Sequence, residues 1–170
     1  MRGNIWEALM NQKVSSVLLA CLLGVGSLGS VGCASMRAAG AKHHYIESQT
    51  ESHVYDKPLN AVWPEARQLL FAKGYSVKDT DASAAETEWK TTSDSFRNRL
   101  LLTGMPVDER TCKVQIMKEE QQRMDGKWST GSTERDLGLE WELLRKVSPD
   151  NAQKIEQEAE VEGQKAAAAK

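Results

Sequence analysis

Residues 59–74, LNAVWPEARQLLFAKG, carry the pattern that decides the fold. Apolar side chains recur at intervals of three and four, which is typical of a helix with one face on a core; they are Leu59, Val62, Ala66, Leu69 and Leu70. Pro64 is tolerated near the first turn, and Gly74 can adopt the left-handed conformation that ends a helix. We therefore predict a core-facing helix that begins between Leu59 and Val62 and ends at Lys73.

Alternating stretches around this helix predict about five strands. Their ranges are 52–57, 75–79, 86–92, 99–103 and 111–119. The polar segments 93–98 and 121–132 are predicted as connections, with Trp128 covering an edge of the sheet. Because no helix alternates with the strands, the fold class is α+β: an antiparallel sheet of about five strands on a central helix, with C-terminal helices.

The C-terminal part is predicted to be helical. Residues 136–147 place Leu137, Trp141 and Leu144 on one face, and Ser148 with Pro149 can end that helix and begin another. We expect residues 163–170 to fray, because they carry little apolar surface. The α+β domain thus spans residues 53–148, and a C-terminal helix with a frayed tail spans 149–170. Trp63, Trp89 and Trp141 are expected in the core.

Upstream of the domain, residues 13–33 read KVSSVLLACLLGVGSLGSVGC, a charge followed by an apolar run and by small residues that end at a cysteine. This order is typical of an export signal and is too weakly apolar for a stable membrane span. Ser30-Val31-Gly32-Cys33 resembles the lipobox of bacterial lipoproteins, although Ser30 stands where an aliphatic residue is usual. The resemblance implies a signal peptide over residues 1–32 and lipidation, with palmitate among the acyl chains, at Cys33.

Two other outcomes remain open for this signal. Ordinary cleavage after Ala34 would give a secreted protein, and no cleavage would leave an N-terminal anchor. Ala34, a non-acidic residue after the cysteine, resembles the signal for the outer membrane, which implies a lipid-anchored protein that faces the periplasm; the alternatives are the inner membrane and secretion.

Residues 33–52 are small and polar without a clear hydrophobic period, which predicts a flexible tether. A random coil of this length would reach about 25 Å. His43 and His44 lie within it, but no third ligand stands at a suitable spacing, so we predict no metal site.

The composition disfavours several functions. Without Arg2, Glu7 and Lys13 the processed chain would carry 20 basic and 23 acidic residues, a net charge of −3, which gives no general attraction to nucleic acid. Cys112 alternates with apolar residues and is predicted as a buried, unpaired thiol. No nucleophile with a base, phosphate loop or metal cluster is found, so we expect neither catalysis nor a cofactor.

Trp63 in the first helix, Gly74-Tyr75 at its end and Glu88-Trp89 in a later strand resemble the BamC-like family of envelope lipoprotein domains, named after an accessory lipoprotein of the outer-membrane β-barrel assembly machine. The resemblance covers the order of elements over most of the processed chain. It implies a helix-grip fold, in which an antiparallel sheet wraps a long helix, and a role in binding.

These observations predict a non-catalytic, membrane-anchored scaffold that contacts another envelope protein and is accessory to an outer-membrane assembly. Trp128, with the segment 121–132, and Tyr55 are the candidate partner contacts, because aromatic side chains bury much area with few rotors. The alternative is a carrier of a small apolar ligand or lipid, in which the sheet would enclose a cavity of several hundred cubic ångströms.

Overall fold

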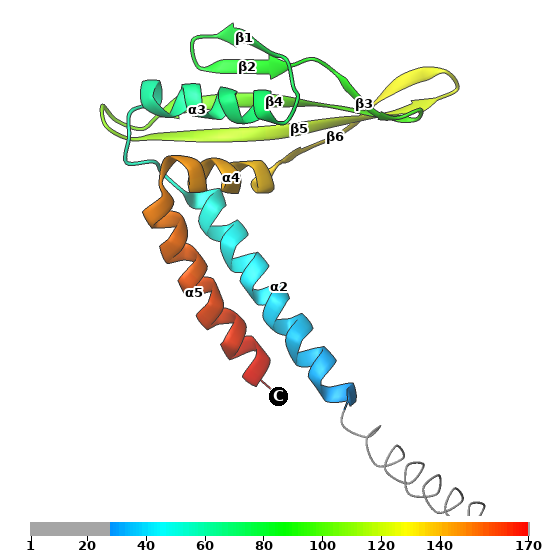
Figure 1. Ribbon diagram of the computed structural model, residues 1–170. Helices are drawn as coiled ribbons and strands as arrows, with labels where there is room; N and C mark the ends of the chain where they lie inside the picture. Colours follow the sequence, from blue (N-terminus) through cyan, green and yellow to red (C-terminus); the bar gives the residue numbers. More distant parts are fainter. Residues whose placement is uncertain (1–27, 170) are drawn as a thin grey trace, which may run out of the picture.

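The computed structural model describes residues 28–169, so most of the predicted signal peptide lies outside the described residues. The elements in chain order are α2 (Leu28–Ser52), α3 (Leu59–Ala72), β1 (Val77–Asp81), β2 (Ala84–Thr87), β3 (Lys90–Ser93), β4 (Phe96–Pro106), β5 (Cys112–Met124), β6 (Lys127–Arg135), α4 (Leu137–Val147) and α5 (Pro149–Ala168). The α+β class is confirmed (Figure 1).

All strand pairs of the sheet are antiparallel, in the order β1-β2-β4-β5-β6, and β3 pairs with the outer part of β4. The long strands β4 and β5 pair along their whole shared length, from Phe96 opposite Gln122 to Pro106 opposite Cys112. α3 and α4 pack on one face of the sheet, and the outer ends of the long strands extend past both helices (Figure 1). The sheet therefore has one covered face and one open face.

The core lies between α3, α4 and the covered face. Val62, Ala66, Leu69 and Leu70 of α3 are buried, which confirms the predicted stripe. The strands contribute every second residue to this core, namely Leu100, Leu102, Cys112, Val114 and Ile116. At Gly104 a Cβ atom would lie 2.6 Å from Leu59 Cδ1 and 3.1 Å from Trp63 Cε3, so a larger residue there would displace side chains of α3. The predicted core-facing helix is the element that fills the covered face.

The prediction of a polar connection over residues 121–132 is wrong, because these residues form the end of β5 and most of β6. Its residues lack apolar alternation because this part of the sheet lies beyond the helices. The β5–β6 register shifts between Glu119 and Gln121. Gly131 occupies this bulge, where a Cβ atom would lie 1.9 Å from the Glu120 carbonyl oxygen, so any other residue would clash with backbone.

Two predicted strands also need correction. The segment 52–57 contributes only an isolated bridge, in which Tyr55 exchanges backbone hydrogen bonds of 2.8 and 3.1 Å with Cys112. The segment 86–92 is interrupted between β2 and β3. As a result the buried Thr87 faces the core, whereas Trp89 lies on the open face and is not a core residue. Trp63 and Trp141 pack against the core as predicted.

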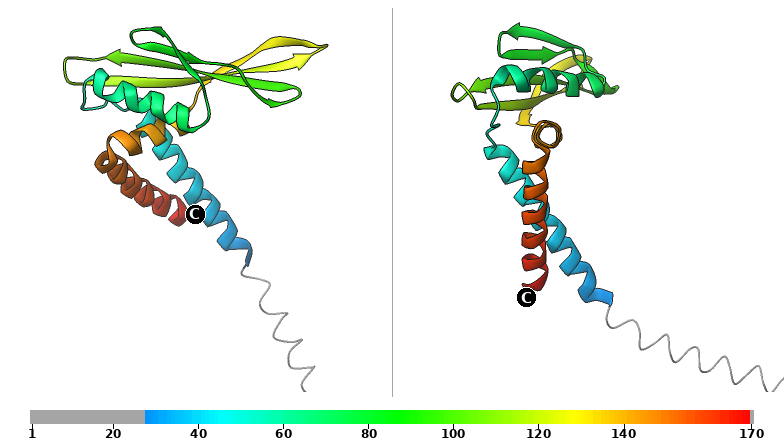
Figure 2. Two further views of the ribbon diagram at one scale, coloured as in Figure 1. Left: turned by 45° about the horizontal axis from the view of Figure 1, so that its top comes forward. Right: turned by 60° about the vertical axis from the view of Figure 1, so that its left-hand side comes forward.

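The predicted tether over residues 33–52 is wrong, because these residues belong to α2, and residues 163–168 of the predicted frayed tail belong to α5. The two helices lie side by side as a stalk that leaves the α4 side of the sheet (Figures 1 and 2). Contacts pair Tyr45 with Glu158 and Ala38 with Gly163, so the helices are antiparallel. Neither helix shows a strong apolar stripe in the sequence. Each is stabilised by packing against the other.

Candidate functional site

The predicted lipidation residue, Cys33, lies exposed near the start of α2. α2 runs from there toward the sheet and α5 runs back, so the last turns of α5 lie beside the N-terminal half of α2 (Figure 2). The 20 residues from Cys33 to Ser52 span about 30 Å as a helix. The sheet is thus held at a defined distance from the cysteine, where a coil would allow a range of distances.

Close contacts between small residues hold the stalk together. A Cβ atom on the buried Gly163 would lie 3.1 Å from the Ala38 carbonyl oxygen and 2.7 Å from Lys42 Cγ. The Tyr45 hydroxyl donates to Glu158 Oε2 at 2.7 Å, and this hydrogen bond raises the pKa of Tyr45 above its usual range. Lys42 also forms an ion pair with Glu160. These contacts make the stalk a paired unit over much of its length.

One arginine joins the stalk to the sheet. Arg135, at the end of β6, donates to both carboxylate oxygens of the buried Glu140 in α4, with N–O distances of 3.2 and 2.5 Å. The same guanidinium donates to the Glu51 carbonyl at 3.2 Å, at the end of α2, and lies 3.5 Å from the Glu51 carboxylate. Hydrogen bonding to Glu140 raises the pKa of Arg135. The orientation of the stalk is therefore tied to β6 through a charged group.

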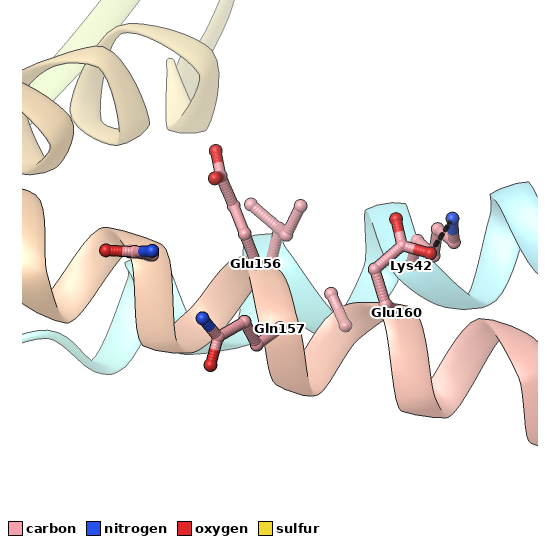
Figure 3. A pocket seen from close by; sticks show the side chains of 7 residues that line it. Lys42, Glu156, Gln157 and Glu160 are labelled. Carbon is pink, nitrogen blue, oxygen red and sulfur yellow. Dashed lines mark ion pairs between the residues drawn. The ribbon is translucent and has the colours of Figure 1, made fainter.

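The stalk carries a surface groove of about 490 Å³ between α2 and α5 (Figure 3). Its lining is mostly charged or amide side chains; it comprises Lys42, Ile46, Gln153, Glu156, Gln157, Ala159 and Glu160. Lys42 and Glu160 meet across the two helices in Figure 3, while Glu156 points toward a neighbouring helix. The groove is a seam in the helix pair that is open to solvent, and its surface is mostly apolar carbon despite the polar groups of its side chains.

The open face of the sheet holds a stacked aromatic and cationic cluster. The Arg97 guanidinium carbon lies 4.5 Å from the ring centroid of Trp89 and 4.5 Å from that of Trp128. Arg97 Nε and Nη2 donate to Gln121 Oε1 at 2.9 and 2.6 Å. The three strands β4, β5 and β6 and the segment before β3 bring these four residues together. We call Trp89, Arg97, Gln121 and Trp128 the Trp–Arg cluster.

Two further arginines border the Trp–Arg cluster. Arg99 lies 4.9 Å from the Trp89 ring centroid and forms ion pairs with Glu119 at 2.7 Å and Glu86 at 3.0 Å. Arg123 lies 6.0 Å from the Trp128 ring centroid, is exposed and donates to the Gly126 carbonyl at 3.4 Å. Arg99 is thus paired with carboxylates, whereas Arg123 forms no ion pair with the described residues.

The structure separates the two residues predicted as partner contacts. Tyr55 is 3% exposed and packs in the core, so its prediction as a surface contact is wrong; its burial also raises the pKa of the phenol. Trp128 is partly exposed and lies on the open face. Sequence reasoning missed Arg97 as its neighbour, because residues 93–98 were predicted as a connection.

Two further reactive groups, Cys112 and His53, lie on either side of Tyr55. Cys112 is fully buried, and burial raises the pKa of its thiol. His53 packs edge-on against Tyr55, with ring centroids 4.7 Å apart, and burial lowers the pKa of the imidazole. Within residues 28–169 we find no group of three His, Cys, Asp or Glu side chains placed to hold a metal ion.

Comparisons with protein families, with curated proteins and with solved structures found no match. Over the part of the chain that the structure describes, no helix is long and apolar enough to cross a membrane.

Proposed function

We propose that this protein is a lipid-anchored envelope scaffold of the bacterial outer membrane, which displays the open face of its sheet to another protein. The observation that carries the proposal is the position of Cys33, the residue of the lipobox resemblance, which is exposed near the start of α2, the helix whose other end meets the sheet domain. Two or three acyl chains on one cysteine would anchor the chain stably. The stalk would then hold the sheet about 30 Å from the lipid surface.

The Trp–Arg cluster supports a binding role for the open face. Its two tryptophans, its Arg97 and the bordering Arg123 are residue types that often dominate the binding free energy of protein interfaces. Neither arginine forms an ion pair with the described residues. The resemblance to BamC-like domains, which serve in binding, points in the same direction. In this proposal the protein is accessory to an outer-membrane assembly.

The carrier alternative has less support. The covered face is filled by α3, whose Leu59 and Trp63 contact the strand at Gly104. The groove of Figure 3 has the volume of a ligand site, but it is open to solvent along the helix pair. It would not enclose an apolar ligand as the cavity of a carrier does.

The anchor is tested by the substitution Cys33→Ala, followed by fractionation of cells and mass spectrometry of the N-terminal peptide. We expect the variant to leave the membrane fraction and the native protein to carry acyl chains on Cys33. The matched control is Met36→Ala, which changes a neighbouring side chain that is 77% exposed and should leave the membrane association intact. Membrane association unchanged in Cys33→Ala, or a native chain that begins at Ser35, would refute the anchor.

A further inference from the structure

We propose that the open face around Arg97 and Arg123 binds an acidic segment of the partner protein, rich in Asp and Glu. This inference rests on the proposed scaffold function and adds the chemistry of the partner. It is argued from the orientation of Arg97, from the charge balance of the face and from the position of the face relative to the stalk.

Arg97 is held ready to bind a carboxylate. Its planar guanidinium is flanked by the rings of Trp89 and Trp128, each 4.5 Å away, and Gln121 Oε1 fixes Nε and Nη2. Nη1 makes no hydrogen bond with the described residues. An arginine whose rotamer is already fixed loses little entropy on binding, and its remaining donors match the geometry of a carboxylate.

The charge balance favours a negative partner. Arg99 with its two partners, Glu86 and Glu119, carries a net charge of −1, which is smaller in magnitude than the +2 of Arg97 and Arg123. Arg97 and Arg123 form no ion pair with the described residues, and both border Trp128. The open face therefore has surplus positive charge, although the processed chain as a whole would carry a net charge of −3. Complementary charge of this kind speeds association and selects the partner.

The position of the face favours a protein segment over the anchoring lipid surface. α4 lies between the sheet and the stalk, so the open face is turned away from the stalk and from Cys33 (Figure 1). An anionic headgroup at the end of the stalk would be about 30 Å from the sheet and on its other side. The face is separate from the groove of Figure 3. Because neighbouring strands form it, it suits an extended acidic segment that lies across them.

The test is photo-crosslinking in intact cells from a photoreactive amino acid at Thr91, an exposed position opposite Arg97 in the β3–β4 pair. A second variant carries the photoreactive amino acid at Gln164 instead, an exposed position on the stalk. The crosslinked peptide is identified by mass spectrometry. Each experiment is repeated with R97Q and R123Q combined, with R123Q alone, and with R145Q as a matched loss of one arginine on α4.

We expect a protein crosslink from position 91 and not from 164, on a peptide with a surplus of Asp and Glu. The double variant should lower its yield by about tenfold, R123Q by less, and R145Q should leave it unchanged. R123Q keeps the test informative if the double variant fails to fold, because Arg123 is exposed and outside the core. An unchanged yield in the arginine variants, or a peptide without acidic surplus, would overturn this inference and leave the scaffold function standing. A crosslink to lipid or glycan alone, or to no protein from either position, would overturn both.

Discussion

Arg135 and Glu140 form a buried ion pair at the junction of sheet and stalk, with guanidinium nitrogens 3.2 and 2.5 Å from the two carboxylate oxygens. Glu140 is 3% exposed and also accepts a hydrogen bond of 2.9 Å from the Ile116 backbone N–H. The pair thus satisfies a backbone donor of β5 and directs Arg135 toward the end of α2. A charge in this position is tolerated only because each of its partners is present.

Glu140→Ala should lower the free energy of unfolding by about 3–5 kcal/mol, because it leaves the Ile116 N–H without its acceptor and removes the bidentate partner of Arg135. Urea denaturation followed by circular dichroism measures the loss. The control is Glu142→Ala, which removes an exposed ion pair to Lys73 in the same helix and should cost at most about 1 kcal/mol. Equal effects of the two substitutions would contradict the structural role of the buried pair.

Leu70→Ala should lower the free energy of unfolding by about 2–5 kcal/mol, because this side chain is fully buried between α3 and the sheet. The neighbouring Phe71 is 55% exposed, so Phe71→Ala should change the free energy by about 0.5 kcal/mol or less. Thermal unfolding of both purified variants compares the two positions. A larger loss at Phe71 than at Leu70 would show that α3 presents the other face to the core.

Stability should fall on acidification because of His53. Burial lowers the pKa of this imidazole below its ordinary value of 6.5, and no hydrogen-bond partner among the described residues contacts its buried Nε2 atom. Between the folded-state pKa and 6.5 the unfolded chain binds more protons, so the free energy of unfolding decreases as the pH falls through this window. Urea midpoints measured from pH 7.5 to pH 5 give the slope.

His53→Gln should reduce that slope, whereas His43→Gln, at an exposed position on α2, should not. The same slope in the native chain and in His53→Gln would assign the pH dependence to other groups.

The helices of the domain could be predicted because their apolar residues recur strongly on one face. The residues of α3 that face the core follow this rule, as does Leu144 in α4. α4 begins after its cap at Asp136, whose side chain accepts a hydrogen bond of 3.0 Å from the Leu139 N–H. The helix that begins at Pro149 was predicted and is confirmed as α5, but its pairing with α2 could not be predicted. The contacts between the two helices involve residues such as Ala38 and Gly163, which give no apolar stripe. Such helices are stabilised by a partner more than 100 residues away in the sequence.

The candidate site was predicted only in part for a related reason. Trp128 was identified by residue type, but its position on the open face depends on β6, whose polar strand pattern carries no apolar alternation. Arg97 matters because Gln121 and two tryptophans from separate segments surround it. Neighbours across strands cannot be read from a local sequence window, so the cluster required the structure.

The stalk makes the sharpest prediction, because it replaces the expected tether and frayed tail. Gly163→Leu should separate α5 from α2, since even a Cβ atom at this position would lie 3.1 Å from the Ala38 carbonyl oxygen. Hydrogen exchange read by mass spectrometry should then become faster in α2 and α5, while β4 and β5 keep their protection. Gln164→Leu adds the same side chain at the adjacent exposed position and should leave exchange in both helices unchanged. If residues 33–52 were instead a flexible tether, they would exchange rapidly in the native chain as well, and Gly163→Leu would have no effect on them.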